Sequence, residues 1–157
     1  MKVGIVSDTH DNIPKIKKAL AAFAMRKCEA LIHAGDVISP FAAKALRSAK
    51  LPIYAVYGNN DGDHKALADL LPGICEGPRL VELDGKKILV AHSITQVPEP
   101  ARAGTDLVVV GHTHVAGIER TKPLVLNPGE CGGWLYARHS VAVLDTARMS
   151  IEEISLD

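Results

Sequence analysis

The sequence has few aromatic side chains, few cysteines and no net charge. Aromatic residues make up 4% of the 157 residues, and 18 acidic side chains balance 18 basic ones. A balanced charge gives no electrostatic basis for binding a membrane surface or bulk nucleic acid, so neither is an expected partner. The cysteines, Cys28, Cys75 and Cys131, are odd in number and lack paired spacing, which predicts reduced thiols and argues against a disulfide framework.

Long apolar runs are also missing. No apolar stretch approaches the roughly 20 residues that a membrane-spanning helix needs, and Asp8 and His10 interrupt the first apolar run, which argues against a signal peptide. We therefore expect a cytoplasmic protein. Apolar residues make up 47% of the chain, which is enough to form a hydrophobic core. The length is typical of one domain, so residues 1–157 are interpreted as a single domain.

The first half of the sequence alternates between strand-like and helical patterns. Apolar runs predict strands at residues 2–6, 30–33 and 52–57. Helices are predicted after Asn12, from Pro40 to about Ala49, and over about 63–71. This alternating order predicts parallel strands connected by helices.

The second half contains mainly strand patterns separated by short turns. Asp84-Gly85 lies between two strand-like runs and predicts a hairpin. Further strands are expected at residues 106–110, 115–119, 124–127, 140–144 and 150–154. The whole pattern predicts an α/β fold, a four-layer sandwich of two mixed β-sheets flanked by helices.

Five of the predicted strands end in polar residues that can bind metal ions. In chain order these residues are Asp8 and His10, Asp36, Asn59, His92, and His112 and His114. Because ligands of open α/β sheets bind beyond the carboxyl ends of the strands, we expect these side chains to converge. Oxygen and imidazole donors without a thiolate suit Mn, Fe, Ni, Co or Zn.

Local spacing supports the same interpretation. In an extended backbone, residues two apart point to the same side, so Asp8 and His10 are expected to face one ion, and His112 and His114 to face the same pocket. A glycine directly precedes Asp36, Asn59 and His112, where it would permit a sharp turn and a close approach of the backbone.

These motifs, in this order, resemble the signature of the calcineurin-like metallophosphoesterases. They are Asp8-x-His10, Gly35-Asp36, Gly58-Asn59-x-Asp61, His92 and Gly111-His112-x-His114. The chain is similar in particular to the small single-domain phosphodiesterases of bacteria and archaea, from residue 4 to about 114, with a further counterpart at Asn127-Pro128-Gly129. The resemblance implies the metallo-dependent phosphatase fold.

The resemblance also implies a dinuclear metal centre. Asp8, His10, Asp36 and His114 would hold one divalent ion, and Asp36 would bridge to a second ion held by Asn59, His92 and His112. Manganese is the expected metal, with Ni, Fe, Co and Zn as alternatives. A hydroxide that bridges the two ions would attack phosphorus in line with the leaving group. The implied function is that of a phosphoric ester hydrolase, a phosphodiesterase on small substrates.

Two residues beside the expected ligands are candidates for supporting roles. Asn60 stands where many family members have histidine, and an amide can donate a hydrogen bond but cannot supply a proton. We therefore expect Asn60 to orient the phosphate and substrates with acidic leaving groups to be favoured. Asp61 is interpreted either as a turn former or as a residue that supports the metal ligands.

Other functions are weighed against the esterase. A non-catalytic scaffold on the same fold would be expected to lose ligands, whereas all seven candidate positions hold competent donors. A nuclease would use the same two-metal chemistry, but the neutral net charge counts against it. Trp134, Leu135 and Tyr136 are open to three interpretations: core, pocket wall, or a contact in a homo-oligomer.

Overall fold

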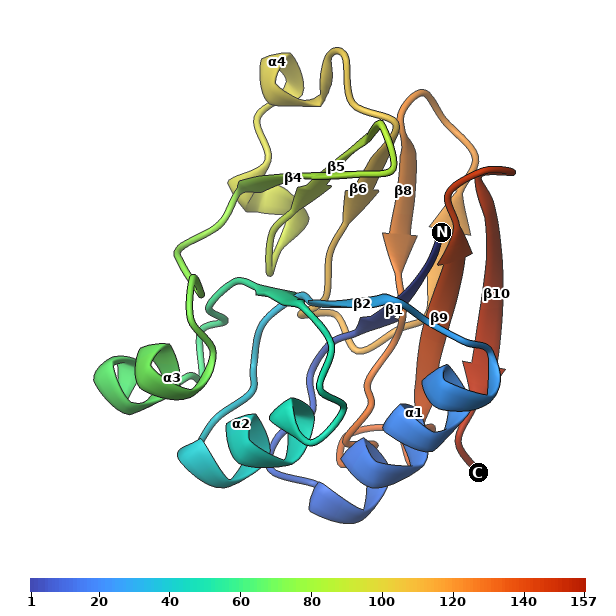
Figure 1. Cartoon of the computed structure of the whole chain (residues 1–157). Coiled ribbons are helices and arrows are strands. Elements are labelled where there is room, and N and C mark those ends of the chain that lie inside the picture. Colours follow the sequence, from blue (N-terminus) through green and yellow to red (C-terminus); the bar gives the residue numbers. More distant parts are fainter.

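Two five-stranded β-sheets pack face to face in the computed structural model, which describes residues 1–157 (Figure 1). The first sheet has the order β10-β9-β1-β2-β3 and the second the order β4-β5-β6-β8-β7. The strands of the first sheet are β1 (Lys2–Val6), β2 (Ala30–His33), β3 (Ile53–Ala55), β9 (Ser140–Asp145) and β10 (Ser150–Ser155). Those of the second are β4 (Arg79–Leu83), β5 (Lys86–Val90), β6 (Leu107–Val109), β7 (Gly117–Glu119) and β8 (Leu124–Asn127).

Both sheets are mixed, as the sequence predicts. In the first sheet β1, β2 and β3 are parallel, whereas β9 pairs antiparallel with β1 and β10 antiparallel with β9. In the second sheet β5, β6 and β8 are parallel, and β4 and β7 are antiparallel edges. The β4–β5 hairpin turns at Asp84 (φ 52°) and Gly85 (φ 72°), the left-handed pair that a two-residue hairpin loop requires.

Helices α1 (Ile13–Met25) and α2 (Pro40–Arg47) cover the outer face of the first sheet, and α3 (His64–Leu70) packs beside α2 (Figure 1). Asn12 caps α1 by accepting a hydrogen bond from the Lys15 N–H, and Ser39 caps α2 in the same way through Phe41. Phe23 of α1 is fully buried against the sheet, where an added Cβ at Gly4 would lie 2.8 Å from its ring.

The main core lies between the two sheets. Val3 and Ile32 project into it from the first sheet, and Ile88, Leu107 and Leu126 from the second. The opposite face of the second sheet is covered by a short segment that contains the 3₁₀ turn η1 (Ile94–Gln96), Val97 and α4 (Glu99–Arg102). The four layers of the predicted sandwich are therefore confirmed.

The structure differs from the sequence prediction in several short elements. Helix α4 is not predicted, because four residues that include Pro100 carry no helical periodicity. Strand β3 is shorter than 52–57, and β7 begins at Gly117 because the preceding residues form a loop in which His112 and His114 have positive φ. No helix combines the length and the apolar character that would be needed to cross a membrane.

Candidate metal centre

All seven predicted ligands meet at the carboxyl-terminal ends of five strands. Asp8 and His10 follow β1, Asp36 follows β2, Asn59 follows β3, His92 follows β5, and His112 and His114 follow β6. The first sheet supplies the loops that follow β1, β2 and β3, and the second sheet supplies those that follow β5 and β6. The ligands therefore gather where the strand ends of the two sheets lie together. The seven side chains lie close together in the structure, as the sequence analysis expected.

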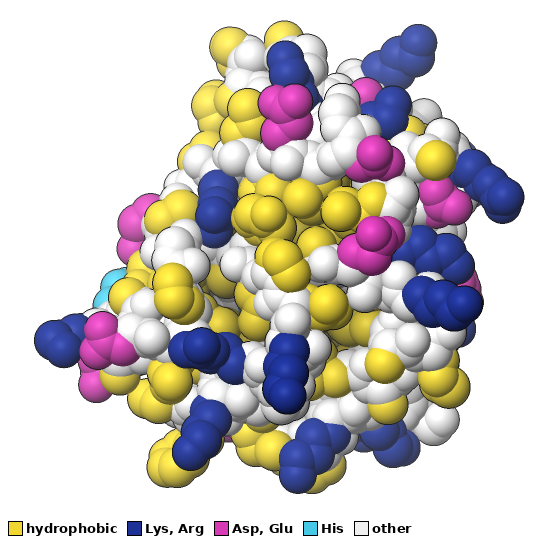
Figure 2. All heavy atoms as spheres, viewed as in Figure 1, with side chains coloured by type: hydrophobic (Ala, Val, Ile, Leu, Met, Phe, Trp, Pro, Cys, Tyr) yellow, Lys and Arg dark blue, Asp and Glu magenta, His cyan; other side chains and the backbone are white.

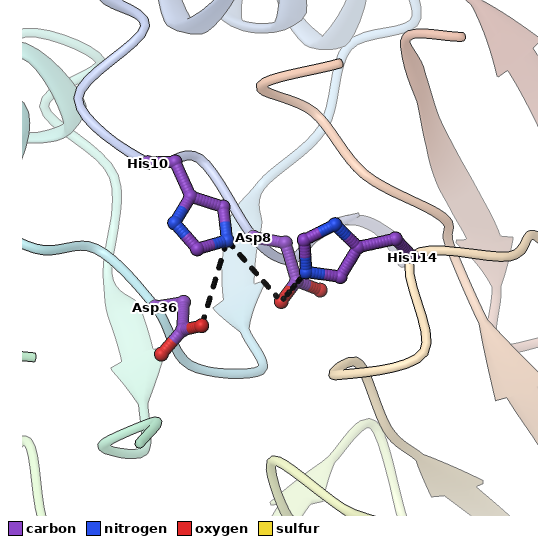
Figure 3. Close-up of side chains that lie close together, drawn as sticks. All are labelled: Asp8, His10, Asp36 and His114. Carbon is purple, nitrogen blue, oxygen red and sulfur yellow. Dashed lines mark ion pairs between the residues drawn. The ribbon is translucent and has the colours of Figure 1, made fainter. Parts of the chain in front are cut away.

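Four of these residues form one compact group. Asp8, His10, Asp36 and His114 each offer a donor atom, and the four atoms lie within 4.8 Å of one another (Figure 3). Nε2 of His10 lies 3.9 Å from Oδ1 of Asp8 and 3.5 Å from Oδ2 of Asp36, and Nε2 of His114 lies 3.4 Å from Oδ1 of Asp8. Two carboxylates and two imidazoles at these distances can surround one divalent ion.

Buried polar atoms without partners lie inside this group. The side chain of Asp8 is fully buried, and its Oδ2 accepts hydrogen bonds from the Ser7 hydroxyl and from the His112 N–H. Oδ1 of Asp8 and Nε2 of His10 have no hydrogen-bond partner. Burial raises the pKa of Asp8, against the opposing effect of the Ser7 hydrogen bond. A carboxylate that is buried at such a cost and aimed at histidine nitrogens fits a cation site.

The remaining three residues form a second group next to the first. Nε2 of His92 and Nδ1 of His112 each lie 2.9 Å from Oδ1 of Asn59. The other ring nitrogen of His92 lies 2.8 Å from the carbonyl oxygen of Ala34, to which it can only donate. In a neutral ring this leaves a lone pair on Nε2 that faces the Asn59 oxygen. A carbonyl oxygen and a ring nitrogen that face each other in this way fit a cation bound between them.

Asp36 connects the two groups. Its Oδ2 lies 3.5 Å from Nε2 of His10 and 3.6 Å from Nε2 of His92. The carboxylate is held by Asn60, whose backbone N–H donates to Oδ1 and whose side-chain amide donates to Oδ2. A carboxylate fixed between histidines of both groups is placed to bridge two ions.

The backbone around the ligands is strained. Five of the seven have a left-handed φ: Asp8 (51°), His10 (42°), Asp36 (61°), His112 (69°) and His114 (61°). Such values are uncommon for non-glycine residues and gather at functional sites. They also show that these ligands lack the extended backbone assumed from the sequence, although Asp8 and His10 do face one site as expected. His112 and His114 do not share one partner, because His114 faces Asp8 whereas His112 faces Asn59.

Two glycines allow the ligand loops to approach one another. A Cβ at Gly58 would overlap the Asp36 carboxylate, and a Cβ at Gly111 would overlap the Ser7 hydroxyl and lie 2.7 Å from Oδ2 of Asp8. The predicted need for a close backbone approach is met at both positions.

Asp61 ties these loops together. Its carboxylate accepts hydrogen bonds from the backbone N–H groups of Asp36 (3.2 Å), Ile38 (2.6 Å) and Gly58 (2.7 Å). Asp61 is therefore both a turn former and the link between the loops that follow β2 and β3. Asn60 is exposed and holds Asp36, and its expected contact with phosphate stays a prediction.

The sequence did not indicate Glu130. Its side chain is fully buried, and Oε2 lies 3.2 Å from Nδ1 of His114. The carboxylate also accepts hydrogen bonds from the backbone N–H groups of Trp134 and Leu135. The available signal was an isolated acidic residue in a segment of Gly, Pro and Cys, which by itself does not distinguish a buried carboxylate from an exposed loop residue.

His33 is buried without being a ligand of either group. Its side chain is fully buried, and Nε2 lies 3.1 Å from the Thr9 hydroxyl. Burial lowers the pKa of His33 to about 3, so the ring is neutral at physiological pH.

Comparisons with known proteins agree with this geometry. The calcineurin-like phosphoesterase superfamily domain matches residues 1–149. Phosphodiesterase MJ0936 of Methanocaldococcus jannaschii is 40% identical over the whole of both chains. A solved archaeal phosphodiesterase superposes with a TM-score of 0.91 at 38% identity and covers 99% of both chains. YfcE, a phosphoesterase from E. coli, shares the fold with a TM-score of 0.74 at 22% identity over both whole chains.

Proposed function

Because the chain belongs to the calcineurin-like phosphoesterase superfamily, we propose that it is a metal-dependent phosphodiesterase that acts on small phosphate diesters. The observation that carries this proposal is the compact group of Asp8, His10, Asp36 and His114, in which buried donor atoms lack partners. Full-length similarity to an archaeal phosphodiesterase supports the choice of diesters over monoesters.

We propose that this centre holds two ions, with Asp36 shared between them. The second group supports a second ion because the Asn59 oxygen and the His92 nitrogen face each other as acceptors. Nitrogen and oxygen ligands without thiolates suit manganese, which we propose as the native metal, and also Ni, Fe, Co and Zn. The reduced thiols of Cys28, Cys75 and Cys131 support a cytoplasmic location.

When bound, divalent ions supply Lewis acidity toward phosphoryl oxygens and make a coordinated water more acidic. The protein contributes fixed positions. Asn60 and Asp61 hold Asp36 and its loop, so the shared carboxylate keeps one orientation through the reaction. The exposed amide of Asn60 and the exposed ring of His112 lie at the open side of the centre, where they can donate hydrogen bonds to a phosphate.

Substrates with good leaving groups are expected to be favoured. Asn60 cannot protonate a departing alkoxide. His64, the nearby histidine in sequence, is exposed, and its ring stacks on Tyr57 with ring centroids 3.9 Å apart. No proton donor is therefore identified on the Asn60 loop, and the rate should depend on the acidity of the leaving alcohol.

Long nucleic acid is not the proposed substrate. The formal net charge is zero. On the face shown in Figure 2, Lys and Arg side chains stand apart from one another around and below an apolar centre. A continuous basic stripe, which would neutralise successive phosphates of a polynucleotide, is not present on that face.

The proposal is tested with metal-stripped protein. Mn, Ni, Co, Zn or Mg is added back, and hydrolysis of bis-p-nitrophenyl phosphate and p-nitrophenyl phosphate is followed by release of p-nitrophenol. We expect metal-restored turnover that is faster for the diester. No turnover with any metal, despite stoichiometric metal binding, would contradict the proposed activity.

A further inference from the structure

Three large apolar side chains stand exposed beside the metal centre. Trp134, Leu135 and Tyr136 are 69%, 61% and 54% exposed. They follow Gly132 and Gly133 in a turn between β8 and β9. Exposed apolar side chains are common singly, but three in a row next to a ligand cluster need a physical explanation.

This turn is attached to the metal centre through several hydrogen bonds. The indole N–H of Trp134 donates to the carbonyl oxygen of His10 at 3.1 Å. The backbone N–H groups of Trp134 and Leu135 donate to Glu130, whose carboxylate lies 3.2 Å from His114. The exposed side chains are therefore held in place relative to two of the candidate ligands.

A cavity of about 800 Å³ opens beside the same turn. Its lining includes His114, Val115, Tyr136, Arg138 and Ser140. His114 thus belongs both to the ligand group and to the cavity wall. Glu153 and Asp157 also line the cavity, so charges of both signs lie in a lining in which only 4 of the 11 residues are hydrophobic. The volume falls within the ~300–1,000 Å³ that is usual for small-molecule sites.

We propose that this cavity binds an aromatic ester group of the substrate, with the Tyr136 ring as its stacking surface. The proposal rests on the function proposed above and adds a substrate class, diesters in which at least one alcohol carries a flat aromatic ring. Of the seven candidate ligands only His114 lines the cavity, so we place the phosphate beside His114 with one of its ester groups extending toward Tyr136. An aromatic ring offers faces to Tyr136 and Val115, and a polar edge to Arg138 or Glu153.

A second copy of the chain fits this surface less well. Three side chains expose much less area than the ~800 Å² that each partner contributes to a standard interface. A second chain seated on the turn would also cover the cavity that adjoins His114. The concave shape and mixed charges suit a small ligand better than a flat protein surface.

The test compares binding of three phosphate diesters that differ only in their ester groups. Diphenyl phosphate and dimethyl phosphate are titrated into the Mn-loaded protein by calorimetry, together with a thymidine methyl phosphate. We expect the aromatic diesters to bind at least about tenfold more tightly than dimethyl phosphate. Tighter binding of the phenyl compound would indicate an aryl alcohol, and tighter binding of the thymidine compound a nucleoside.

Substitutions test whether the preference for aromatic diesters arises in the cavity. Tyr136→Ala should weaken binding of the aromatic diesters about 3- to 10-fold and leave dimethyl phosphate unchanged, because Tyr136 has no hydrogen bond to the metal centre. Trp134→Ala is a second variant, but it also removes the contact with His10. Leu80→Ala, which alters an exposed apolar side chain on the edge strand β4, is the matched control and should change neither affinity.

The outcomes separate this proposal from the proposed function. Equal affinities for all diesters, or an aromatic preference that Tyr136→Ala leaves intact, would overturn the proposal even if the protein hydrolyses diesters. An aromatic preference that depends on Tyr136, in a protein without turnover, would keep the binding site and reject the activity. A dimer that dissociates in Tyr136→Ala, with unchanged ligand affinities, would assign the turn to self-association instead.

Discussion

The carboxylate of Glu130 lies 3.2 Å from Nδ1 of His114, while Nε2 of the same ring faces Asp8 at 3.4 Å. The imidazole is therefore placed between a buried carboxylate and the candidate metal site. A carboxylate that accepts the other ring N–H of a metal-binding histidine orients the ring and increases its basicity, and Glu130 lies where it would do so once His114 binds a metal ion. His114 depends on a residue that lies 16 positions later in the chain and outside every recognised motif.

Glu130→Gln should weaken metal binding without removing any ligand. The substitution keeps the shape of the side chain and removes its charge, so we expect manganese affinity to fall about 10- to 100-fold. Calorimetric titration of the metal-stripped variant measures the change. Glu119→Gln, at an exposed position in β7, is the control. Unchanged affinity in Glu130→Gln, with the fold intact, would show that Glu130 only anchors the turn at Trp134.

Asp36→Asn should abolish activity and reduce the number of bound ions. The Asp36 carboxylate is shared by both groups, so its loss would affect both of the proposed ions, and we expect turnover of the diester to fall at least about 100-fold. Metal content after dialysis and hydrolysis of bis-p-nitrophenyl phosphate are measured together. Asp69→Asn, on the exposed surface of α3, should behave as wild type. Wild-type activity in Asp36→Asn would exclude the shared-carboxylate centre.

Gly58→Ala should disrupt the metal centre by steric overlap. A Cβ at this position would collide with the carboxylate and the backbone nitrogen of Asp36, both parts of the loop that holds the shared ligand. We expect weaker metal binding and a loss of activity, measured on the same preparations by calorimetry and turnover. Gly117→Ala is the matched control, because a Cβ there meets no atom within 4 Å. Equal behaviour of the two variants would contradict the close packing described here.

The two phenylalanines should differ sharply in their effect on stability. Phe23 is 1% exposed beneath the first sheet, whereas Phe41 is 78% exposed at the start of α2. Phe23→Ala should lower the free energy of unfolding by about 3–5 kcal/mol because it leaves a cavity. Phe41→Ala should change it by less than about 0.5 kcal/mol. Urea denaturation of the metal-stripped proteins measures both, and similar losses would contradict the assigned packing.

Thiol reactivity should follow burial and rise with pH. Burial raises the pKa of Cys28 to about 11 and of Cys131 to about 12, so both thiols are protonated at pH 8. Because the thiolate is the reactive form, we expect only Cys75 to react rapidly with a disulfide reagent in the folded protein. Raising the pH increases the thiolate fraction of Cys28 before that of Cys131. Cys75→Ser should remove the fast reaction, and three fast thiols at pH 8 would contradict the prediction.

The sequence was most informative where a local pattern carries the structure. Asn12 and Ser39 predict the starts of α1 and α2, and Asp84-Gly85 predicts the β4–β5 hairpin. Helix caps and tight turns can be predicted in this way because they depend on neighbouring residues. The convergence of Asp8 and Asp36 also followed from sequence, since β1 and β2 are parallel and end at a common edge of the first sheet. These features need no knowledge of distant contacts.

The division of the site into two groups did not follow from spacing. His112 faces Asn59 whereas His114 faces Asp8, and both have a left-handed backbone. The residue types at these positions do not predict that conformation. The role of Glu130 depends on burial against His114, a contact between loops from different strands. The division into two ligand groups and the contact between Glu130 and His114 both depend on tertiary structure. They therefore cannot be read from local sequence patterns.

The position of β1 has a consequence for how the site forms during synthesis. This strand precedes the other nine in the sequence, yet it lies between β2 and β9, and β9 ends at Asp145. Until β9 arrives, the β1 edge that will receive it stays unpaired, and the loop that carries Asp8 lacks its hydrogen bonds to Cys131 and Gly132. Pairing across so many residues is slow compared with local folding. The candidate metal centre therefore gains these contacts only after the segment up to Asp145 has been made, so a chain interrupted before β9 would carry all seven candidate ligands without the packing that positions them.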